Sequence, residues 1–211
     1  MPRIWRYVLA HDGGRAPCID NGMLTLCCCK PRIRKNASTG DWVVGLAPKR
    51  FGIGLVAWAG QVSAVMPMGM YRERFPERSD AIYRVVAIAA DGREILRHVG
   101  GEYHSNPEAH RTDASGVNTL AFSPFWYFGR QAKSLPGHLL DLTHYYVGQT
   151  SRGSSADAVT LLRDWLLHWP PGIHGRPRDV GATAGIADAA PIPFPEEGVE
   201  ASLSMTLEHQ G

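Results

Sequence analysis

The chain has 211 residues, of which 44% are hydrophobic and 20% are charged, and this composition supports the core of one globular domain. A formal net charge of +2 does not by itself indicate binding to nucleic acid. Apolar runs fall short of the roughly 20 residues of a membrane span, and no signal-peptide pattern appears, so we expect no membrane partner. The four cysteines do not resemble a secreted disulfide framework, which favours the reducing cytoplasm.

The predicted elements are mostly strands. Segments rich in β-branched and aromatic residues, bounded by glycine, proline and aspartate, are typical of strands. Glycines in the longest segment indicate bulges or bends, and Pro31 is expected to end the second strand. In chain order the predicted strands are 3–10, 23–29, 40–47, 51–68 and 117–123.

A hairpin, a long loop and one helix complete the pattern. Asp91-Gly92 separates two apolar stretches within residues 81–99, which predicts a tight hairpin. Residues 100–116 are polar and bounded by glycine, so we expect a loop there. Helical spacing of apolar residues is strong only in 154–169, where a serine can cap the start and two prolines end the pattern.

Many strands and few helices predict an α+β protein built on a curved sheet or a small β-barrel. A basic segment, a Gly-Asp-Trp strand and a long following strand resemble PUA-like barrels of the EVE and ASCH type, here with one main C-terminal amphipathic helix. We expect one domain over 1–180. Residues 181–211 are rich in Ala, Gly, Pro and Glu and lack periodicity, which predicts a flexible tail.

The densest positive charge lies in residues 27–50, which hold six basic side chains and the single acid Asp41. In an extended segment, alternation would place Lys30, Arg32 and Arg34 on one face. Three like charges repel one another unless an anion faces them, so the pattern favours phosphate binding. The alternative is a solvated strand edge that guards against aggregation. We interpret Asp41 as a turn residue.

Aromatic and cationic residues also gather in residues 123–136. Trp126 and Tyr127 could stack on a base while Arg130 binds its phosphate, or the aromatic rings could pack under a lid. Two further arginines flank the predicted helix. Arg152 lies at its start, where free backbone amides could bind an anion or be capped by a side chain. Arg176 follows its end.

Candidate acids and bases lie in the loop from 98 to 113. Histidine beside carboxylates suits proton transfer near neutral pH, although exposed loops also hold such residues without a role. The candidates are His104, His110, Glu102 and Asp113. We expect no metal at Cys27–Cys29, because consecutive residues of a strand point to opposite faces, and we interpret these as small buried thiols. No dinucleotide or Walker fingerprint is present, so the sequence assigns no cofactor.

Five blocks in order are similar to the nucleotide modification associated domain 2 family. They lie at 7–18, 24–45, 116–129, 148–166 and 172–180, and include "CKPRIR", "GDW", "GVN" and "GRP". The chain departs from the family at Gly14, where relatives carry phenylalanine, and in a shorter segment between Met70 and Ile82. The resemblance implies an association with DNA base modification in bacteria and phages, and a nucleotide or DNA as ligand. It also implies a shared functional block that includes Lys30, Arg32, Arg34, Asp41 and Trp42, with Trp42 available for base stacking.

These observations predict a domain that binds a nucleotide or base in a basic, aromatic-lined cleft and catalyses group transfer to it. One alternative is a non-catalytic reader of modified bases. Another is an interaction subunit that binds the partner proteins of a DNA-modification system.

Overall fold

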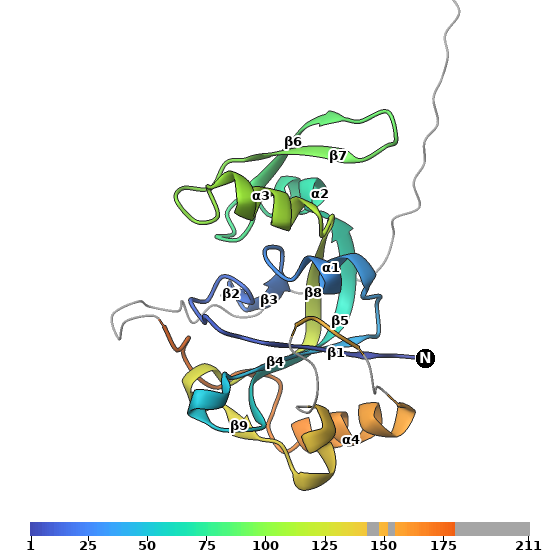
Figure 1. Cartoon of the computed structure of the whole chain (residues 1–211), viewed down its shortest axis with the longest axis vertical. Helices are drawn as coiled ribbons and strands as arrows, with labels where there is room; N and C mark the ends of the chain where they lie inside the picture. The colour runs from blue at the N-terminus through green and yellow to red at the C-terminus, as the bar shows by residue number, and fades with distance from the viewer. Residues whose placement is uncertain (143–147, 152–154, 180–211) are drawn as a thin grey trace, which may run out of the picture.

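The computed structural model describes residues 1–142, 148–151 and 155–179, which form an α+β fold around a mixed eight-stranded sheet (Figure 1). The main path of the sheet is β1-β4-β5-β8-β3-β2, with β9 beside β5 and β10 beside β8. Among the described strands, only β1–β4 and β8–β10 are parallel pairs. Its strands are β1 (Ile4–Val8), β2 (Cys18–Asp20), β3 (Met23–Leu26), β4 (Trp42–Leu46), β5 (Leu55–Pro67), β8 (Asn118–Tyr127), β9 (Lys133–Ser134) and β10 (Gly172–Ile173).

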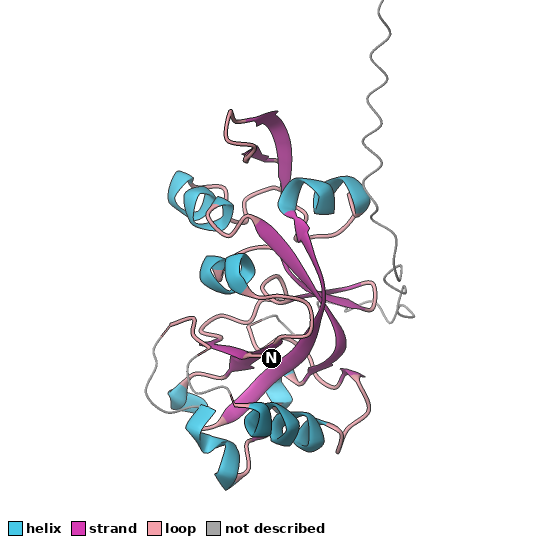
Figure 2. Cartoon of the chain, turned by 90° about the vertical axis from the view of Figure 1, so that its right-hand side faces the viewer, coloured by secondary structure: helices cyan, strands magenta, loops and turns pink. Residues whose placement is uncertain are grey.

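Across the described residues the sheet does not close on itself, so the predicted α+β class is confirmed but a PUA-like barrel is not seen. Figure 1 shows helices α2 (Met68–Arg74) and α3 (Pro107–Ala114) and the hairpin of β6 (Tyr83–Ile88) and β7 (Glu94–His98) at one end of the long strands β5 and β8, and helix α4 (Ala156–Leu166) toward the other end. Helix α1 (Pro31–Asn36) lies beside β8. Turned by 90°, the structure shows the long strands running through the middle of the fold, with helices on both sides of them (Figure 2). No helix of the described residues is both long and apolar enough to span a membrane.

The core lies on both faces of the sheet. On one face Trp58 donates its indole N–H to Tyr7 Oη at 3.0 Å, and its ring lies against Gly45, where a Cβ would come within 2.1 Å of the indole nitrogen. On the other face α4 packs Leu162 and Leu166 against the sheet. The first turn of α4 is capped by Ser155, whose Oγ accepts the Ala158 amide at 3.0 Å. The helix thus lies inside the predicted range 154–169.

The hairpin predicted at Asp91-Gly92 is confirmed. Strands β6 and β7 pair antiparallel, and Gly92 has a φ of 81°, which glycine adopts without strain. Three short 3₁₀ turns, at Lys49–Phe51, Gly129–Gln131 and Gly137–Leu142, connect the remaining elements. The predicted tail 181–211 lies outside the described residues.

The extended basic strand predicted for residues 30–34 is wrong, because this segment is the helix α1. Pro31 occupies its first turn, where a missing N–H costs nothing and the fixed φ suits a helix. Alternation along a strand therefore does not apply to Lys30, Arg32 and Arg34. Ile33 and Arg34 face the protein, whereas Arg32 is exposed.

Asp41 fixes the chain before β4. Its carboxylate accepts the backbone N–H of Arg3 at 2.8 Å, the indole N–H of Trp5 at 3.0 Å and the backbone N–H of Ser38 at 3.1 Å. Burial alone would raise the pKa of Asp41, but these hydrogen bonds outweigh it, and the pKa lies below its ordinary value of 3.8. The carboxylate therefore has a structural role that matches its interpretation as a turn residue.

Replacing Asp41 with asparagine is expected to lower the free energy of unfolding at neutral pH by about 1–3 kcal/mol. The pKa of the carboxyl is lower in the folded state, so its contribution is present above the ordinary value and is lost as the pH falls through the folded-state pKa. The gap between wild type and variant should therefore narrow in acid, as urea unfolding at two pH values would measure. The exposed neighbour Thr39 provides the control variant Thr39→Ala. A gap that does not change with pH would contradict this account.

Candidate active site

Cys29 occupies the turn between strand β3 and helix α1. It and Lys30 are consecutive residues in the left-handed region, with φ values of 56° and 43°, which is uncommon for residues with a side chain. The Cys29 amide donates to Asp113 Oδ1, and its carbonyl accepts the Arg34 Nε at 2.6 Å. The peptide is thus held on both sides, and the side chain is half-buried, unlike those of the other three cysteines.

Asp113 is a fully buried carboxylate on α3. Besides the Cys29 amide it accepts the Tyr83 hydroxyl at 2.8 Å and the Nδ1 of His104 at 2.6 Å. Burial alone would raise its pKa, but the hydrogen bonds, first that from His104, hold the pKa of Asp113 below its usual range. The group therefore stays ionised at neutral pH.

His104 joins this carboxylate to the thiol of Cys29. Its ring stacks on Tyr103 with 4.1 Å between centroids, and its Nε2 lies 3.5 Å from Cys29 Sγ. The hydrogen bond to Asp113, followed by the contact with Cys29, raises the pKa of His104 to about 10 against the effect of burial. The ring is therefore protonated at neutral pH. We refer to these three residues as the Cys29–His104–Asp113 chain.

The Cys29–His104–Asp113 chain forms part of the wall of a pocket between α1 and α3. The pocket has a volume of about 440 Å³ and is open to solvent. Lys30 also lines the pocket, and its ammonium lies 4.6 Å from the centre of the Tyr7 ring. Residues that line the pocket are Cys29, Lys30, Pro31, His104, Asn106, Glu108, Ala109, Thr112, Asp113 and Gln149. The pocket is of the size that small-molecule sites have.

Three donor atoms here could also meet a metal ion. Those of Cys28, His104 and Asp113 all lie within 4.8 Å of one another. Nδ1 of His104 is already committed to Asp113. The donor set therefore suits proton transfer better than metal binding.

Arg34 supports the site from beneath and does not face a ligand. Its side chain is fully buried, and its guanidinium donates to the Asn118 carbonyl at 2.7 Å and to the carbonyls of Cys29 and Asp113. A Cβ at Gly116 would lie 2.4 Å from Arg34 Cζ, so glycine is required there. The predicted contact of Arg34 with phosphate is thus wrong: the residue ties β3, α1, α3 and β8 together.

The three aromatic residues predicted to stack on a base are also in the core. Trp42 and Trp126 are 2% and 1% exposed and stack on each other, with 6.1 Å between ring centroids. Tyr127 is fully buried and donates its hydroxyl to Asp12. An external base cannot reach these rings, so this interpretation is corrected. This stacked pair joins β4 and β8 across the face of the strand β5 that lies between them.

The remaining predicted residues are dispersed. Arg130 and Arg176 meet at the opposite end of β8 from the pocket, where the Arg130 amide donates to the Arg176 carbonyl at 2.9 Å. His110, on α3, stacks on Tyr83, and Glu102 is exposed before His104. Arg152 lies outside the described residues. The structure thus brings Lys30, His104 and Asp113 together.

Sequence reasoning missed Cys29 as a site residue. The sequence predicts one buried strand that includes the cysteine triplet, but β3 ends at Leu26, and Cys29 lines the pocket. Its place directly before Lys-Pro was the available signal, because proline at the first turn of a helix puts the preceding residues in a strand-to-helix turn.

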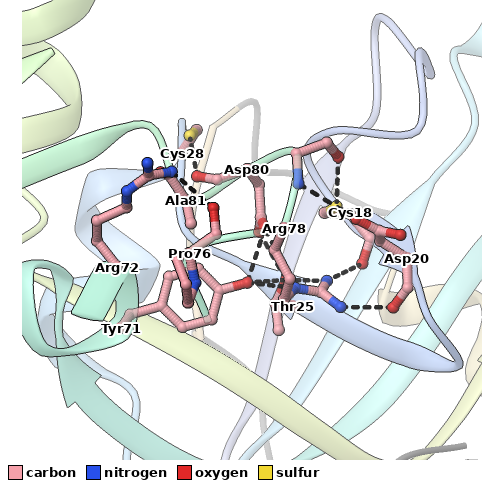
Figure 3. Close-up of polar contacts among 11 residues, drawn as sticks. Cys18, Asp20, Thr25, Cys28, Tyr71, Arg72, Pro76, Arg78, Asp80 and Ala81 are labelled. Carbon is pink, nitrogen blue, oxygen red and sulfur yellow. Dashed lines mark hydrogen bonds and ion pairs between the residues drawn. The ribbon is translucent and has the colours of Figure 1, made fainter. Parts of the chain in front are cut away.

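A second polar cluster, also missed, joins β2 and β3 to the segment after α2 (Figure 3). Asp80 is fully buried and accepts the Thr25 hydroxyl at 2.6 Å and the Tyr71 hydroxyl at 2.7 Å. Arg78 donates to Asp80 at 3.3 Å and to the Thr25 hydroxyl at 2.9 Å. Burial would lower the pKa of Arg78, but Asp80 raises it, so the guanidinium stays protonated, and its contacts hold this part of the core together.

The fold and the site define an α+β domain with an open mixed sheet and a polar pocket at one end of its long strands. Residues 1–184 match the family described as nucleotide modification associated domain 2, and the chain belongs to this family. No significant match was found among curated proteins or solved structures.

Proposed function

We propose that this domain is a group-transfer enzyme that acts on a nucleotide or a DNA base bound in the pocket between α1 and α3. The observation that carries the proposal is the continuous Cys29–His104–Asp113 chain at the pocket wall, with 2.6 Å between Asp113 and His104 and 3.5 Å between His104 and Cys29. Membership of a nucleotide modification family supports a nucleotide or base as the ligand.

Each residue has a chemical role that follows from its position. Asp113 accepts a hydrogen bond from Nδ1–H and so orients the ring of His104, while Nε2 gives or takes a proton on the pocket side. Lys30 lines the pocket and carries a positive charge, and Arg32 is exposed two residues further along. Both side chains can therefore bind phosphate. A base must leave the duplex, or arrive as a free nucleotide, to reach these groups.

A reader of modified bases is the alternative, since binding needs Lys30 and Arg32 but no proton transfer. The His104–Asp113 contact favours the enzyme, because a carboxylate, an imidazole and a thiol in sequence suit proton transfer, which the recognition of a base does not require. Partner proteins of a DNA-modification system would then supply or receive the transferred group.

The test is to measure binding of nucleotides and of single- and double-stranded DNA, modified and unmodified, across a salt series. We expect salt-dependent binding, with the salt slope falling by roughly one unit for each of Lys30→Ala and Arg32→Ala that removes a phosphate contact. Arg176→Ala, at the far end of β8, is the matched control and should leave the slope unchanged. Unchanged slopes in the first two variants would place the ligand elsewhere.

His104→Gln separates the two functions. An enzyme should keep ligand affinity and lose turnover by about 10²-fold or more. A reader should keep both its affinity and its preference for the modified base. Absence of binding to every ligand would leave the interaction subunit as the explanation.

A further inference from the structure

We infer that Cys29 is a nucleophile that carries an acyl group as a thioester, so that the group transferred at this site is an activated carboxyl: an ester, an amide or a thioester. This inference rests on the proposed function and names its substrate class and covalent intermediate.

The position of Cys29 is the first reason. It lies in a sharp turn from strand β3 into helix α1, the kind of strand-to-helix turn on which hydrolases expose a nucleophile. Two consecutive residues with side chains, Cys29 and Lys30, hold positive φ values there, an arrangement that costs energy and concentrates at functional sites. Of the four cysteines, all of which are described, only this one is not buried.

The partner of the sulfur is the second reason. Nε2 of His104 lies 3.5 Å from Cys29 Sγ, and Nδ1 is fixed by a carboxylate that no solvent reaches. A protonated imidazole stabilises the negative charge of a neighbouring thiolate. It also carries, on Nε2, the proton that a leaving group takes up when it departs. Thiol, imidazole and carboxylate thus stand in the order that nucleophilic acyl transfer uses.

Donors for the developing oxyanion are also at the pocket. The Oε1 atom of Gln149 accepts the Ile33 amide at 3.2 Å, which leaves the NH₂ group of the same side chain as a donor on a pocket-lining residue. Lys30 adds a positive charge on the pocket wall. Such groups stabilise the charge that forms on a carbonyl oxygen when a thiolate attacks it.

The chemistry then proceeds in two balanced steps. The Cys29 thiolate attacks the carbonyl carbon of the donor, the S–C bond forms, and the bond to the leaving group breaks as that group takes the proton from His104. An amine of the base or nucleotide then attacks the thioester, the N–C bond forms, the S–C bond breaks, and His104 accepts the proton of the amine. The sum is transfer of the acyl group from donor to amine, with no change of oxidation state.

Addition of the thiol to the ring of a base is the competing use of a nucleophilic cysteine. The first step of such an addition expels no group. No leaving group is therefore formed that would need the proton on Nε2 of His104. The buried Asp113 that keeps His104 protonated fits acyl transfer better. The two uses leave different adducts on Cys29.

The experiment treats the full chain with p-nitrophenyl acetate and follows nitrophenolate release and intact mass. We expect a burst of nitrophenolate, an increase in mass of one acetyl group on the Cys29 peptide, and its removal by neutral hydroxylamine. Cys29→Ala should abolish the burst, and His104→Gln should slow it by about 10²-fold or more. Cys18→Ala, a buried thiol that contacts Ser79, is the matched control and should keep the burst.

The inference would be overturned if only other residues were acetylated. It would also be overturned if the Cys29 and His104 variants gave the same burst as the wild type. A nucleotide adduct on Cys29 without acylation would overturn it as well. If the His104 variant does not fold, alkylation of the wild type by iodoacetamide tests whether Cys29 is a nucleophile. Cys29 should then react well before the other three thiols. Reaction of all four thiols at the same rate would contradict the assignment. Nucleotide affinity is measured separately. A wild-type protein that is acylated at Cys29 but does not bind nucleotide refutes only the proposed function. A wild-type protein that binds nucleotide but is not acylated refutes only this inference.

Discussion

Replacement of Arg34 by alanine is expected to lower the free energy of unfolding by about 3–5 kcal/mol, the usual cost of removing one partner from a buried charged pair. The change would leave Asp113, 4.0 Å from Arg34 Nη2, without its nearby guanidinium, and it would leave the carbonyls of Cys29 and Asn118 without that donor. Urea unfolding monitored by tryptophan fluorescence would measure the loss. The same variant should lose activity, because Arg34 fixes the turn that carries Cys29.

Arg32→Ala is the matched control, since Arg32 is the exposed arginine on the same helix. It should change stability by less than about 0.5 kcal/mol, as surface substitutions usually do. Its effect should appear in the salt dependence of ligand binding instead. Equal destabilisation by the two alanine variants would refute the assignment of Arg34 as a buried support.

Replacement of Asp80 by alanine should have a similar effect of about 3–5 kcal/mol, because Arg78 would remain buried without its carboxylate. The hydroxyls of Thr25 and Tyr71 would also lose their acceptor. The loss should appear as a lower urea midpoint with an unchanged denaturant slope.

Asp91→Ala provides the control for Asp80, because Asp91 also pairs with an arginine, Arg93, but at an exposed hairpin turn. Solvent screens that pair, so the midpoint should stay close to that of the wild type. If Asp80→Ala behaved like Asp91→Ala, the cluster in Figure 3 would not be the structural tie that its burial indicates.

Family blocks that lie far apart in the sequence meet at the pocket. Cys29 to Arg34 come from the "CKPRIR" block, and Gly116 to Asn118 come from the "GVN" block, whose glycine gives the Arg34 guanidinium its space. The Asn118 carbonyl accepts from Arg34 in turn. These blocks therefore share one physical task, which is to fix the turn of Cys29 against α3.

The local patterns of the sequence determined the elements whose signals are local. Runs of β-branched and aromatic residues, the Asp-Gly turn of β6–β7 and the capped periodic helix α4 depend on neighbours within a few residues, so they could be predicted. The α+β class followed from counting these elements. His104 and Asp113 could be named among the candidates, because histidine beside carboxylates in one polar segment suits proton transfer near neutral pH.

Tertiary structure alone decided which charged residues face a ligand and which lie in the core. Arg32 and Arg34 are the same residue type two positions apart, and only the rotation of α1 exposes one and buries the other. Tertiary structure also decided the partner of His104, because Cys29 lies 75 residues away and reaches it only when β3 pairs with β8 and α3 packs beside α1. Side-chain type is a property of the sequence, whereas burial and contact between distant residues arise only when the chain folds.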